Sequence, residues 1–402
     1  MTGGRPGSTR ATPPPLVIGG DGDVRPDHRL LIPGHGKTPL PPPGTTIQDF
    51  GGEAMGATWS VRLVPSPGLD RATVQSAIEE ELARFVALFS AWDPRSELSR
   101  LNAAPPGFWA VSEPFWTLLN RAMDLADDTN GAVDPTLGAL IDLWGFGPSG
   151  PRPLDGFGTA YTVPSEDEII AARAVSGWGL LRLNREARAV QQLGGIRLDL
   201  SGIAMGHAVD SVSARLTAIG ATHHLVRIGA DHRGAGVKPD GYAWWVALKP
   251  VAGGTAPHTV AALFDLALST STVRARSFDA DGRNHGHILD GRTGRPVDNG
   301  VASVTVLADT ALYADAMATA LTVMGPVEGP AWAEALGLAA VFTVQTGDGP
   351  IEIVSPAFVA MLSEGAEPET GSAGHDLAPL GVRPDARLSD RAPLDDGDPA
   401  GT

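Results

Sequence analysis

Proline and glycine are concentrated at the two ends of this 402-residue chain, and this distribution confines stable packing to the middle. Residues 1–46 contain two runs of three prolines and show no amphipathic period. Residues 364–402 carry nine acidic residues and three arginines among scattered prolines and glycines. Neither end can bury enough apolar surface to offset the loss of chain entropy. We therefore expect two disordered ends around one folded domain over 47–363.

The composition argues against several classes of protein. A net charge of -16 repels phosphate backbones and anionic lipids, which disfavours nucleic-acid binding and attachment to a membrane surface. The absence of cysteine excludes disulfides, thiolate metal sites, cysteine nucleophiles and a lipidated cysteine. The sequence contains no apolar run long enough to span a membrane and no secretory signal pattern. These features predict a soluble, cytoplasmic protein with no membrane anchor.

Helical and strand-like patterns follow one another irregularly through the middle of the chain. Apolar spacings of three and four predict helices over 70–89, from 112, from 165, over 310–324 and from 331. Short apolar or alternating runs predict strands over 179–183, 189–193, 196–200, 225–228, 244–248, 301–307 and 341–344. Because strands do not alternate regularly with helices, we expect an α+β fold with mixed or antiparallel sheets and flanking helices.

The most unusual stretch holds two histidines and an aspartate within six residues. His285, His287 and Asp290 are followed by a glycine-rich turn that contains two arginines. Such a cluster of titratable side chains marks a candidate functional stretch. It is equally typical of a hairpin whose polar side chains satisfy the amides of a turn. Composition alone leaves both interpretations open.

Two further stretches suggest a site for phosphate and metal. A predicted strand ends at Ser201-Gly202 and passes into a helix, which directs free amides at whatever lies above the turn, although most such junctions bind nothing. On the predicted helix from 310, Asp315 and Thr319 share one face, one turn apart. A carboxylate beside a hydroxyl suits a hard cation such as Mg²⁺, but this pair is also common on solvated helix faces.

Taken in order, these stretches resemble one family, the FAD:protein FMN transferases or ApbE family. The resemblance runs from Met55 to Val344 and therefore covers nearly the whole predicted domain. The blocks that carry it are Met55-Gly56-Ala57-Thr58, Ser96-Glu97-Leu98-Ser99-Arg100-Leu101-Asn102, Gly131-Ala132-Val133-Asp134-Pro135-Thr136, 143–148, 199–210, 236–250, 287–297 and 314–319. The resemblance implies an FAD-binding transferase domain with the family's α+β architecture, which is similar to the tunnelling fold.

The resemblance also implies an activity and a set of site residues. Family members use FAD and Mg²⁺ to place FMN on a Thr or Ser hydroxyl of a partner flavoprotein, and they release AMP. It implies metal ligation by Asp315, Thr319 and the Gly202 carbonyl oxygen. It implies that His287 is a base or a transient carrier of FMN, with Asp290 as its orienting partner. Contacts to FAD are implied for Met55, Trp92, Ala132, Val133, Asp134, Asp199, Met205, His287 and Ile288.

Several positions depart from the family's pattern, and they cluster in the blocks of the implied site. Met205 stands where Lys or another polar residue is usual, Thr272 and Ala230 replace glycines, and Gly291 replaces proline. Two alternatives to transfer onto a protein remain open, and Met205, Thr272 and Ala230 favour the first of them. One is an FAD-binding protein of the same fold with weak or no transferase activity, which would serve as a flavin carrier or a partner-binding module. The other is an FAD pyrophosphatase that yields FMN and AMP.

Overall fold

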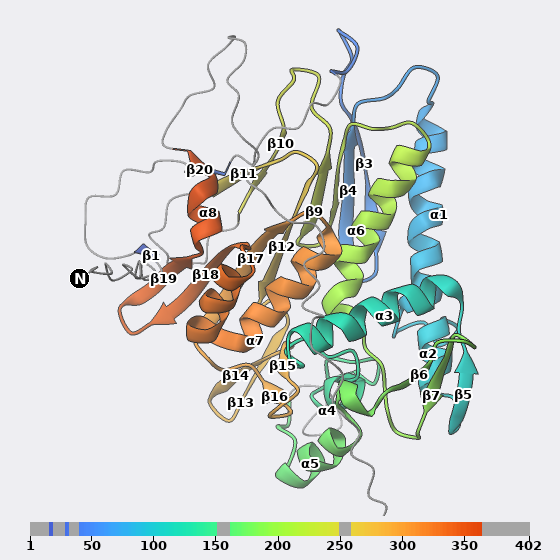
Figure 1. Cartoon of the computed structure of the whole chain (residues 1–402), viewed down its shortest axis with the longest axis vertical. Helices are drawn as coiled ribbons and strands as arrows, with labels where there is room; N and C mark the ends of the chain where they lie inside the picture. The colour runs from blue at the N-terminus through green and yellow to red at the C-terminus, as the bar shows by residue number, and fades with distance from the viewer. Residues whose placement is uncertain (1–15, 19–28, 32–39, 151–160, 249–258, 364–402) are drawn as a thin grey trace, which may run out of the picture. The chain divides into compact units, whose positions relative to one another are not determined.

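The computed structural model describes residues 16–18, 29–31, 40–150, 161–248 and 259–363. Over these residues the largest sheet has nine strands, all antiparallel, in the order β1-β19-β18-β17-β12-β9-β8-β4-β3 (Figure 1). The strands are β1 Leu16–Ile18, β3 Gln48–Ala54, β4 Ala57–Leu63, β8 His224–Ile228, β9 Asp231–Ala235, β12 Leu266–Thr272, β17 Val301–Ala308, β18 Ala339–Thr346 and β19 Gly349–Val354.

Helices α1 Arg71–Phe89, α6 Ser201–Ala218 and α7 Ala311–Ala335 form the main core with one face of this sheet (Figure 1). Helices α6 and α7 approach closely at Gly206, where an added Cβ would lie 2.2 Å from the Ala311 carbonyl oxygen. The Asp210 carboxylate of α6 accepts hydrogen bonds from the first amides of α7, at Ala311 and Leu312. This contact satisfies amides that a helix leaves unpaired and fixes the start of α7 against α6.

A four-stranded sheet packs near the opposite face, in the order β10-β11-β2-β20. Its strands are β10 Trp244–Ala247, β11 Thr259–Leu263, β2 Arg29–Leu31 and β20 Leu362–Ser363. A second apolar core joins Trp244 and Leu263 of this sheet to Leu225 and Leu268 of the large sheet and to Phe358 of helix α8. Helix α8 spans Pro356–Met361. Strands β11 and β2 run parallel, so the sheets are mixed and antiparallel, and the predicted α+β class is confirmed.

The remaining elements lie together below the large sheet in the view of Figure 1. Helices α4 and α5 share a small apolar core with the β13–β14 hairpin, which includes Leu140, Trp144, Ile169 and Phe278. The elements are α2 Glu97–Asn102, β5 Gly107–Ala110, α3 Glu113–Asp128, α4 Gly138–Leu143, α5 Glu166–Ala174, a 3₁₀ helix Trp178–Leu180, β6 Arg182–Asn184, β7 Ala189–Gln192, β13 Ser277–Ala280, β14 Arg283–Gly286, β15 Leu289–Asp290 and β16 Arg295–Pro296.

The predicted helices are present, with ends close to those expected. Asp70 caps α1 by accepting the Thr73 amide at 2.9 Å, and Ser165 caps α5 in a reciprocal capping box with Glu168. The two helices predicted on either side of residue 325 meet at Gly325, whose φ of 85° and ψ of -174° interrupt the helix. The second of them therefore continues directly from this kink instead of beginning at 331.

One predicted strand is wrong, and another is right only at its end. Over 196–200 the backbone pairs with loops and a side chain: the Leu198 amide donates to Asn102 Oδ1 at 2.8 Å, and the Asp199 amide donates to the Pro135 carbonyl at 2.9 Å. The apolar side chains of this run are buried, and its backbone forms no strand ladder. The strand predicted over 179–183 starts within the 3₁₀ helix and becomes a strand only at Arg182.

The N-terminal segment also differs from the expectation of disorder in two short pieces. Strand β1 pairs with β19, and strand β2 lies between β11 and β20, with the Leu31 side chain fully buried. Short apolar runs inside a proline-rich segment can add strands to existing sheets even though they show no period of their own. The predicted disordered tail over 364–402 lies outside the described residues.

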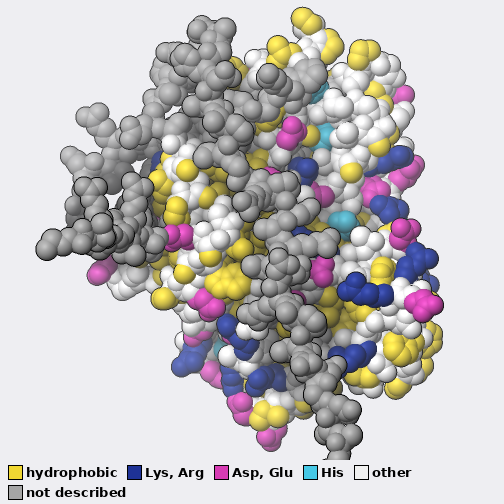
Figure 2. Space-filling model, viewed as in Figure 1, with side chains coloured by type: hydrophobic (Ala, Val, Ile, Leu, Met, Phe, Trp, Pro, Cys, Tyr) yellow, Lys and Arg dark blue, Asp and Glu magenta, His cyan; other side chains and the backbone are white. Residues whose placement is uncertain are grey.

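Charged side chains of both signs are interspersed on the face seen in Figure 2. The described residues also form exposed ion pairs, such as Arg62 with Asp49 and Arg95 with Asp93. Exposed pairs of this kind contribute at most about 1 kcal/mol each, so the fold depends mainly on its apolar cores. Among the described helices, none is both long enough and apolar enough to cross a membrane.

Buried His224 should make the stability of this fold depend on pH. Its Nδ1 donates to the Ala221 carbonyl and its Nε2 accepts from the Ser213 hydroxyl, both at 2.7 Å. Burial lowers the pKa of His224 to about 4, against about 6.5 in an unfolded chain. Between these values the unfolded state binds more protons, so the free energy of unfolding decreases as the pH falls, by about 3 kcal/mol over the whole window.

We expect the double variant Ser213→Ala/His224→Phe to lose part of this acid sensitivity. Urea unfolding at pH 7.5 and at pH 4.5 gives the change in stability for each protein. The difference between the two pH values should be smaller in the variant than in the parent chain. An equal difference in both proteins would contradict the assignment.

Candidate active site

A cavity of about 1770 Å³ opens where the β3–β4 and β8–β9 turns meet the end of β12 and the start of α6. Most site residues predicted from the sequence line this cavity, although they come from segments far apart in the chain. They are Met55, Trp92, Ala132, Val133, Asp134, Asp199, Gly202, Met205, His287, Ile288, Asp315 and Thr319. Asp290 is the one predicted site residue that does not line it.

The three proposed metal ligands converge where α6 packs on α7. Asp315 is 8% exposed, and its Oδ2 accepts the Gly206 amide at 2.9 Å. In an α-helix this amide points at the carbonyl four residues earlier, which is that of Gly202, so the carboxylate lies beside that carbonyl. Thr319 lies one turn along α7 and shares a hydrogen bond with the Ser271 hydroxyl at 3.1 Å. A Cβ added to Gly202 would lie 3.8 Å from Thr319 Cγ2.

A second buried carboxylate in the cavity, Asp231, was missed by the sequence analysis. It begins β9, is 5% exposed and accepts a hydrogen bond from the Ser269 hydroxyl. Burial raises the pKa of Asp231 to about 7, and burial together with the nearby Asp231 carboxylate raises the pKa of Asp315 well above its usual range. The available signal was a lone acidic residue directly after the Gly229-Ala230 turn.

The oxygen atoms near Asp315 belong to a carboxylate, a hydroxyl and a main-chain carbonyl. Within the part of the chain that the structure describes, no group of three His, Cys, Asp or Glu side chains is placed to hold a metal. Neither Asp231 nor Asp315 forms an ion pair with a described Lys or Arg. Two buried carboxylates therefore lie near each other without a cationic side chain to offset their charge.

His287 lies at the wall of the cavity in an orientation set by the backbone. Its amide and its ring Nδ1 both contact the Arg276 carbonyl oxygen, at 3.0 and 3.2 Å. Because a carbonyl oxygen only accepts, the Arg276 contact favours the tautomer with the hydrogen on Nδ1 and the lone pair on Nε2; the Val273 backbone also forms a hydrogen bond with the ring. Burial, and then the positive charge of Arg276, lower the pKa of His287 below 6.5. The imidazole is therefore neutral at neutral pH and able to take up a proton.

The predicted pairing of Asp290 with His287 is wrong. The Asp290 carboxylate accepts two hydrogen bonds from the Arg292 guanidinium, at 2.9 and 3.1 Å, and a third from the Arg292 amide. The Arg276 carbonyl orients His287 instead. His285, the competing histidine, packs against the rings of Trp144 and Phe278, with centroids 5.4 and 5.3 Å away, and so belongs to the small core.

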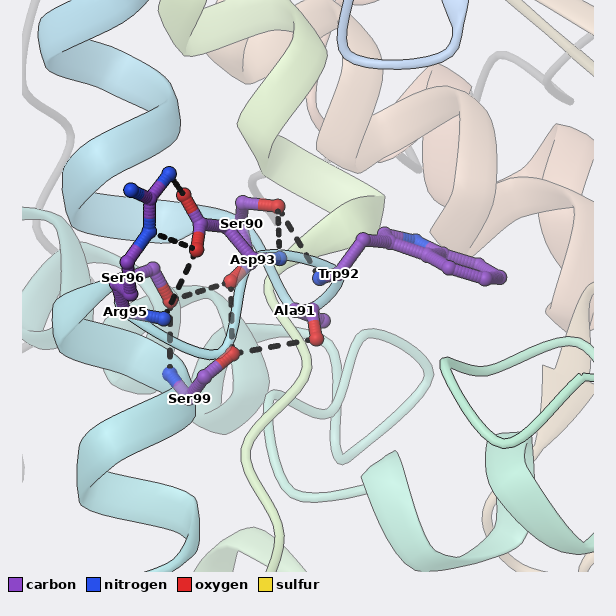
Figure 3. A network of polar contacts seen from close by, with 7 residues as sticks. All are labelled: Ser90, Ala91, Trp92, Asp93, Arg95, Ser96 and Ser99. Atoms are coloured by element: carbon purple, nitrogen blue, oxygen red, sulfur yellow. Dashed lines mark hydrogen bonds and ion pairs between the residues drawn. The ribbon is translucent and has the colours of Figure 1, made fainter.

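The loop between α1 and α2 holds Trp92 at the margin of the cavity. Ser90 Oγ accepts the amides of Trp92 and Asp93, both at 3.1 Å, and the Ser90 carbonyl accepts the Ser96 hydroxyl (Figure 3). The indole points away from this network and is 57% exposed (Figure 3). The Arg276 guanidinium lies 5.9 Å from its centroid. An exposed ring on a rigid loop is suited to stacking on a flat ligand.

Asp134 and Asp199 each shape the turn in which they lie. Asp134 accepts the amide and the hydroxyl of Thr136, at 2.8 and 2.6 Å, and the Trp178 amide at 3.1 Å. Asp199 accepts the Ser201 amide at 2.9 Å, where α6 begins. Burial raises the pKa of both carboxyls despite these hydrogen bonds. The lone pairs that these bonds leave unused can accept hydrogen bonds from a ligand.

Comparison with known proteins identifies the family of this chain. The model of the ApbE family matches residues 55–342, which is well over half of the chain. The chain belongs to the ApbE family. A relative named FAD:protein FMN transferase, from Vibrio cholerae serotype O1, is 36% identical over 320 residues, which cover 78% of this chain and 92% of the relative. A protein of the same name from Escherichia coli K12 is 30% identical over 326 residues, which cover 79% of this chain and 90% of the relative.

Solved ApbE structures share the fold described above. The apo form of the flavinyl transferase ApbE from Pseudomonas stutzeri superposes with a TM-score of 0.72 at 33% identity, covering 80% of this chain and 98% of that one. The ApbE protein of Thermotoga maritima gives a TM-score of 0.70 at 31% identity, covering 79% of this chain and 100% of that one. This ApbE chain is therefore an enzyme of the flavin transferase family with the family's α+β fold.

The departures of this ApbE chain from the family's pattern lie mostly at the cavity. Met205, Ala230 and Thr272 all line it. The half-buried Met205 side chain packs against the main core, and a Cβ added to Gly229 would lie 3.2 Å from Met205 Cε. Met205 therefore forms part of the cavity wall beside the β8–β9 turn. Gly291 does not line the cavity.

Proposed function

We propose that this protein transfers FMN from FAD to a Thr or Ser hydroxyl of a partner flavoprotein, depends on Mg²⁺ and releases AMP. The observation that carries the proposal is the shared cavity: neutral His287 and the oxygen atoms near Asp315 line the same space as the residues expected to contact FAD. The names of the relatives, FAD:protein FMN transferase, support the same donor and the same class of acceptor.

The residues near Asp315 fit a hard divalent cation. The Asp315 carboxylate, the Thr319 hydroxyl and the Gly202 carbonyl are the oxygen donors that Mg²⁺ prefers, and these residues would hold it. The buried Asp231 carboxyl lies close by and has no ion-pair partner among the described residues. Because its pKa is raised to about 7, it would lose its proton and add negative charge when a cation binds nearby. When bound, Mg²⁺ would offset the charge on the FAD pyrophosphate.

His287 supplies the proton acceptor for transfer. With Nδ1–H held by the Arg276 carbonyl, Nε2 takes the proton of the acceptor hydroxyl as the hydroxyl oxygen bonds to the phosphorus of the FMN half. The bond between that phosphorus and the bridging oxygen breaks. The electron pair leaves with AMP. The products are a phosphodiester between FMN and the acceptor, AMP, and a proton on His287.

A two-product assay tests the proposal against its alternatives. The protein is incubated with FAD, Mg²⁺ and a candidate acceptor flavoprotein, and a version of the acceptor with Thr→Val at the target serves as control. AMP with an FMN mass shift on the acceptor alone, and none on its control, supports transfer. AMP with free FMN indicates a pyrophosphatase, and FAD binding without AMP indicates a flavin-binding protein. Either of the last two results contradicts the proposal.

Met205→Lys should strengthen FAD binding in the absence of Mg²⁺. A lysine at this part of the cavity wall places an ammonium group near the proposed phosphate position, where a charge-assisted hydrogen bond replaces an apolar contact. We expect Kd for FAD in EDTA to fall about tenfold, which corresponds to about 1.4 kcal/mol. Calorimetry on Met205→Gln, which has similar length and no charge, provides the control. Equal Kd values for the two variants would place residue 205 away from the phosphates.

A further inference from the structure

The cavity extends beyond the residues expected to contact FAD. It continues along strand β10, where Ser60 and Arg62 of β4, Leu225 and Arg227 of β8, and residues 245–248 line it. We call this part the β10 groove. Residues that alternate with these along β4 and β8, such as Val61 and Val226, are buried in the main core. Since alternate side chains of a strand point to opposite faces, the groove lies on the face of the large sheet away from α6 and α7.

Strand β10 presents to this groove a backbone edge with which no described strand pairs. Among the described strands it is the last of its sheet and pairs only with β11. The Leu248 amide donates to the Thr259 carbonyl at 2.9 Å, and the antiparallel register then turns the amides of Val246 and Trp244 toward β11 as well. The intervening residues, 245 and 247, direct their amides and carbonyls away from β11. Neither backbone has a hydrogen-bond partner among the described residues.

The chemistry of transfer requires a polypeptide in the same space. Pockets for single small ligands measure roughly 300–1000 Å³. This cavity, at about 1770 Å³, has room for more than one such ligand. Because the acceptor hydroxyl belongs to a protein, the segment that carries it must enter alongside FAD to bring oxygen and phosphorus together. A chain without secondary structure of its own can enter such a groove most easily.

We propose that the β10 groove binds the hydroxyl-bearing segment of the acceptor protein in an extended conformation, as an added strand on β10. This inference rests on the proposed transfer to a protein hydroxyl. The free amides and carbonyls of residues 245 and 247 supply main-chain hydrogen bonds that do not depend on the acceptor's sequence. The Trp245 side chain, 37% exposed, supplies an apolar contact.

The floor of the groove adds a preference for acidic segments. Arg227 donates to the Gly229 carbonyl at 3.0 Å and forms no ion pair with a carboxylate of the described residues. Arg62, on the neighbouring strand, pairs with Asp49 at the exposed end. Arg227 therefore has charge available for an acidic side chain of the acceptor next to its hydroxyl.

Ala247→Pro tests this surface with little effect on the rest of the sheet. Proline removes an amide that points into the groove, whereas the bonds between β10 and β11 use residues 244, 246 and 248. Ala247→Thr retains the amide and is the matched control. The probe is a mixture of nine-residue peptides with threonine at the centre and random residues elsewhere, incubated with FAD and Mg²⁺. Mass spectrometry measures FMN on the peptides, and flavin fluorescence measures Kd for FAD.

We expect Ala247→Pro to lower FMN transfer at least tenfold with Kd for FAD unchanged, and Ala247→Thr, which keeps the amide, to retain clearly more transfer than Ala247→Pro. Parent-like transfer by Ala247→Pro would overturn the docking proposal. If the parent binds FAD but labels no peptide and releases no AMP, the proposed function itself is contradicted.

Hydrogen exchange tests the surface without relying on transfer or on the folding of a variant. Peptides with valine in place of threonine should slow exchange at the amides of residues 245 and 247 in the parent chain. Unchanged exchange would overturn the proposal. Slow exchange at these amides in the free, full-length chain would also overturn it, because another part of the chain would then occupy the edge.

Discussion

Replacing Asp315 with asparagine should lower Mg²⁺-dependent turnover on the order of 100-fold or more. Asparagine has nearly the same shape and can still accept the Gly206 amide, so the contact between α6 and α7 is retained. What it removes is the only charged group among the three proposed ligands. AMP release measured over a range of MgCl₂ concentrations should show both a lower maximum and a higher Mg²⁺ requirement.

The stability of the same variant separates loss of a ligand from loss of structure. Asp315 and Asp231 are buried near each other, and their repulsion destabilises the metal-free fold. Asp315→Asn should therefore unfold at the same urea concentration as the parent or a higher one in EDTA. Thr319→Ala, which removes a neutral ligand, should cost less activity, and Thr319→Ser should cost least. Parent-like Mg²⁺ dependence in Asp315→Asn would rule out this carboxylate as a ligand.

Local patterns predicted the helices well because their causes are local. Asp70 and Ser165 cap their helices through amides three residues away, and apolar spacing marks the buried face of each helix. The strand predicted over 196–200 is wrong because its structure depends on residues that are remote in sequence. Its apolar residues are buried as expected, but Asn102 and Pro135, both remote in sequence, take the hydrogen bonds that a ladder would use.

The candidate site was predicted largely by the order of its sequence blocks, and the structure brings those blocks to one cavity. The failures are residues whose importance depends on distant neighbours. Asp231 is a common residue after a turn until the fold places it near Asp315. Asp290 is the nearest acid to His287 in sequence, yet Arg292 binds it. The group that does orient His287 is the Arg276 carbonyl. Every residue has a main-chain carbonyl, so the sequence does not show which one will contact a side chain.

His287→Ala should bind FAD with nearly the parent's Kd and release AMP about 10²–10⁴ times more slowly, which is the usual contribution of a general base. His285→Gln is the matched control on the same hairpin. That ring packs against Trp144 and Phe278, so its replacement should affect stability more than kcat. Equal kcat values for parent and His287→Ala would leave this histidine a structural role only.

The pH dependence and a single-turnover assay distinguish the two roles considered for His287. Burial and Arg276 lower its pKa, so the neutral form persists below pH 6.5, and kcat/KM should decline only as the pH falls further. Arg276→Gln removes that positive charge and should move the decline to higher pH, although its carbonyl still holds Nδ1.

A base needs the acceptor before FAD can be split, whereas a nucleophile would release one equivalent of AMP from FAD alone and retain FMN on its ring. We expect no such burst, because the proton that Nε2 is placed to accept belongs to the acceptor hydroxyl.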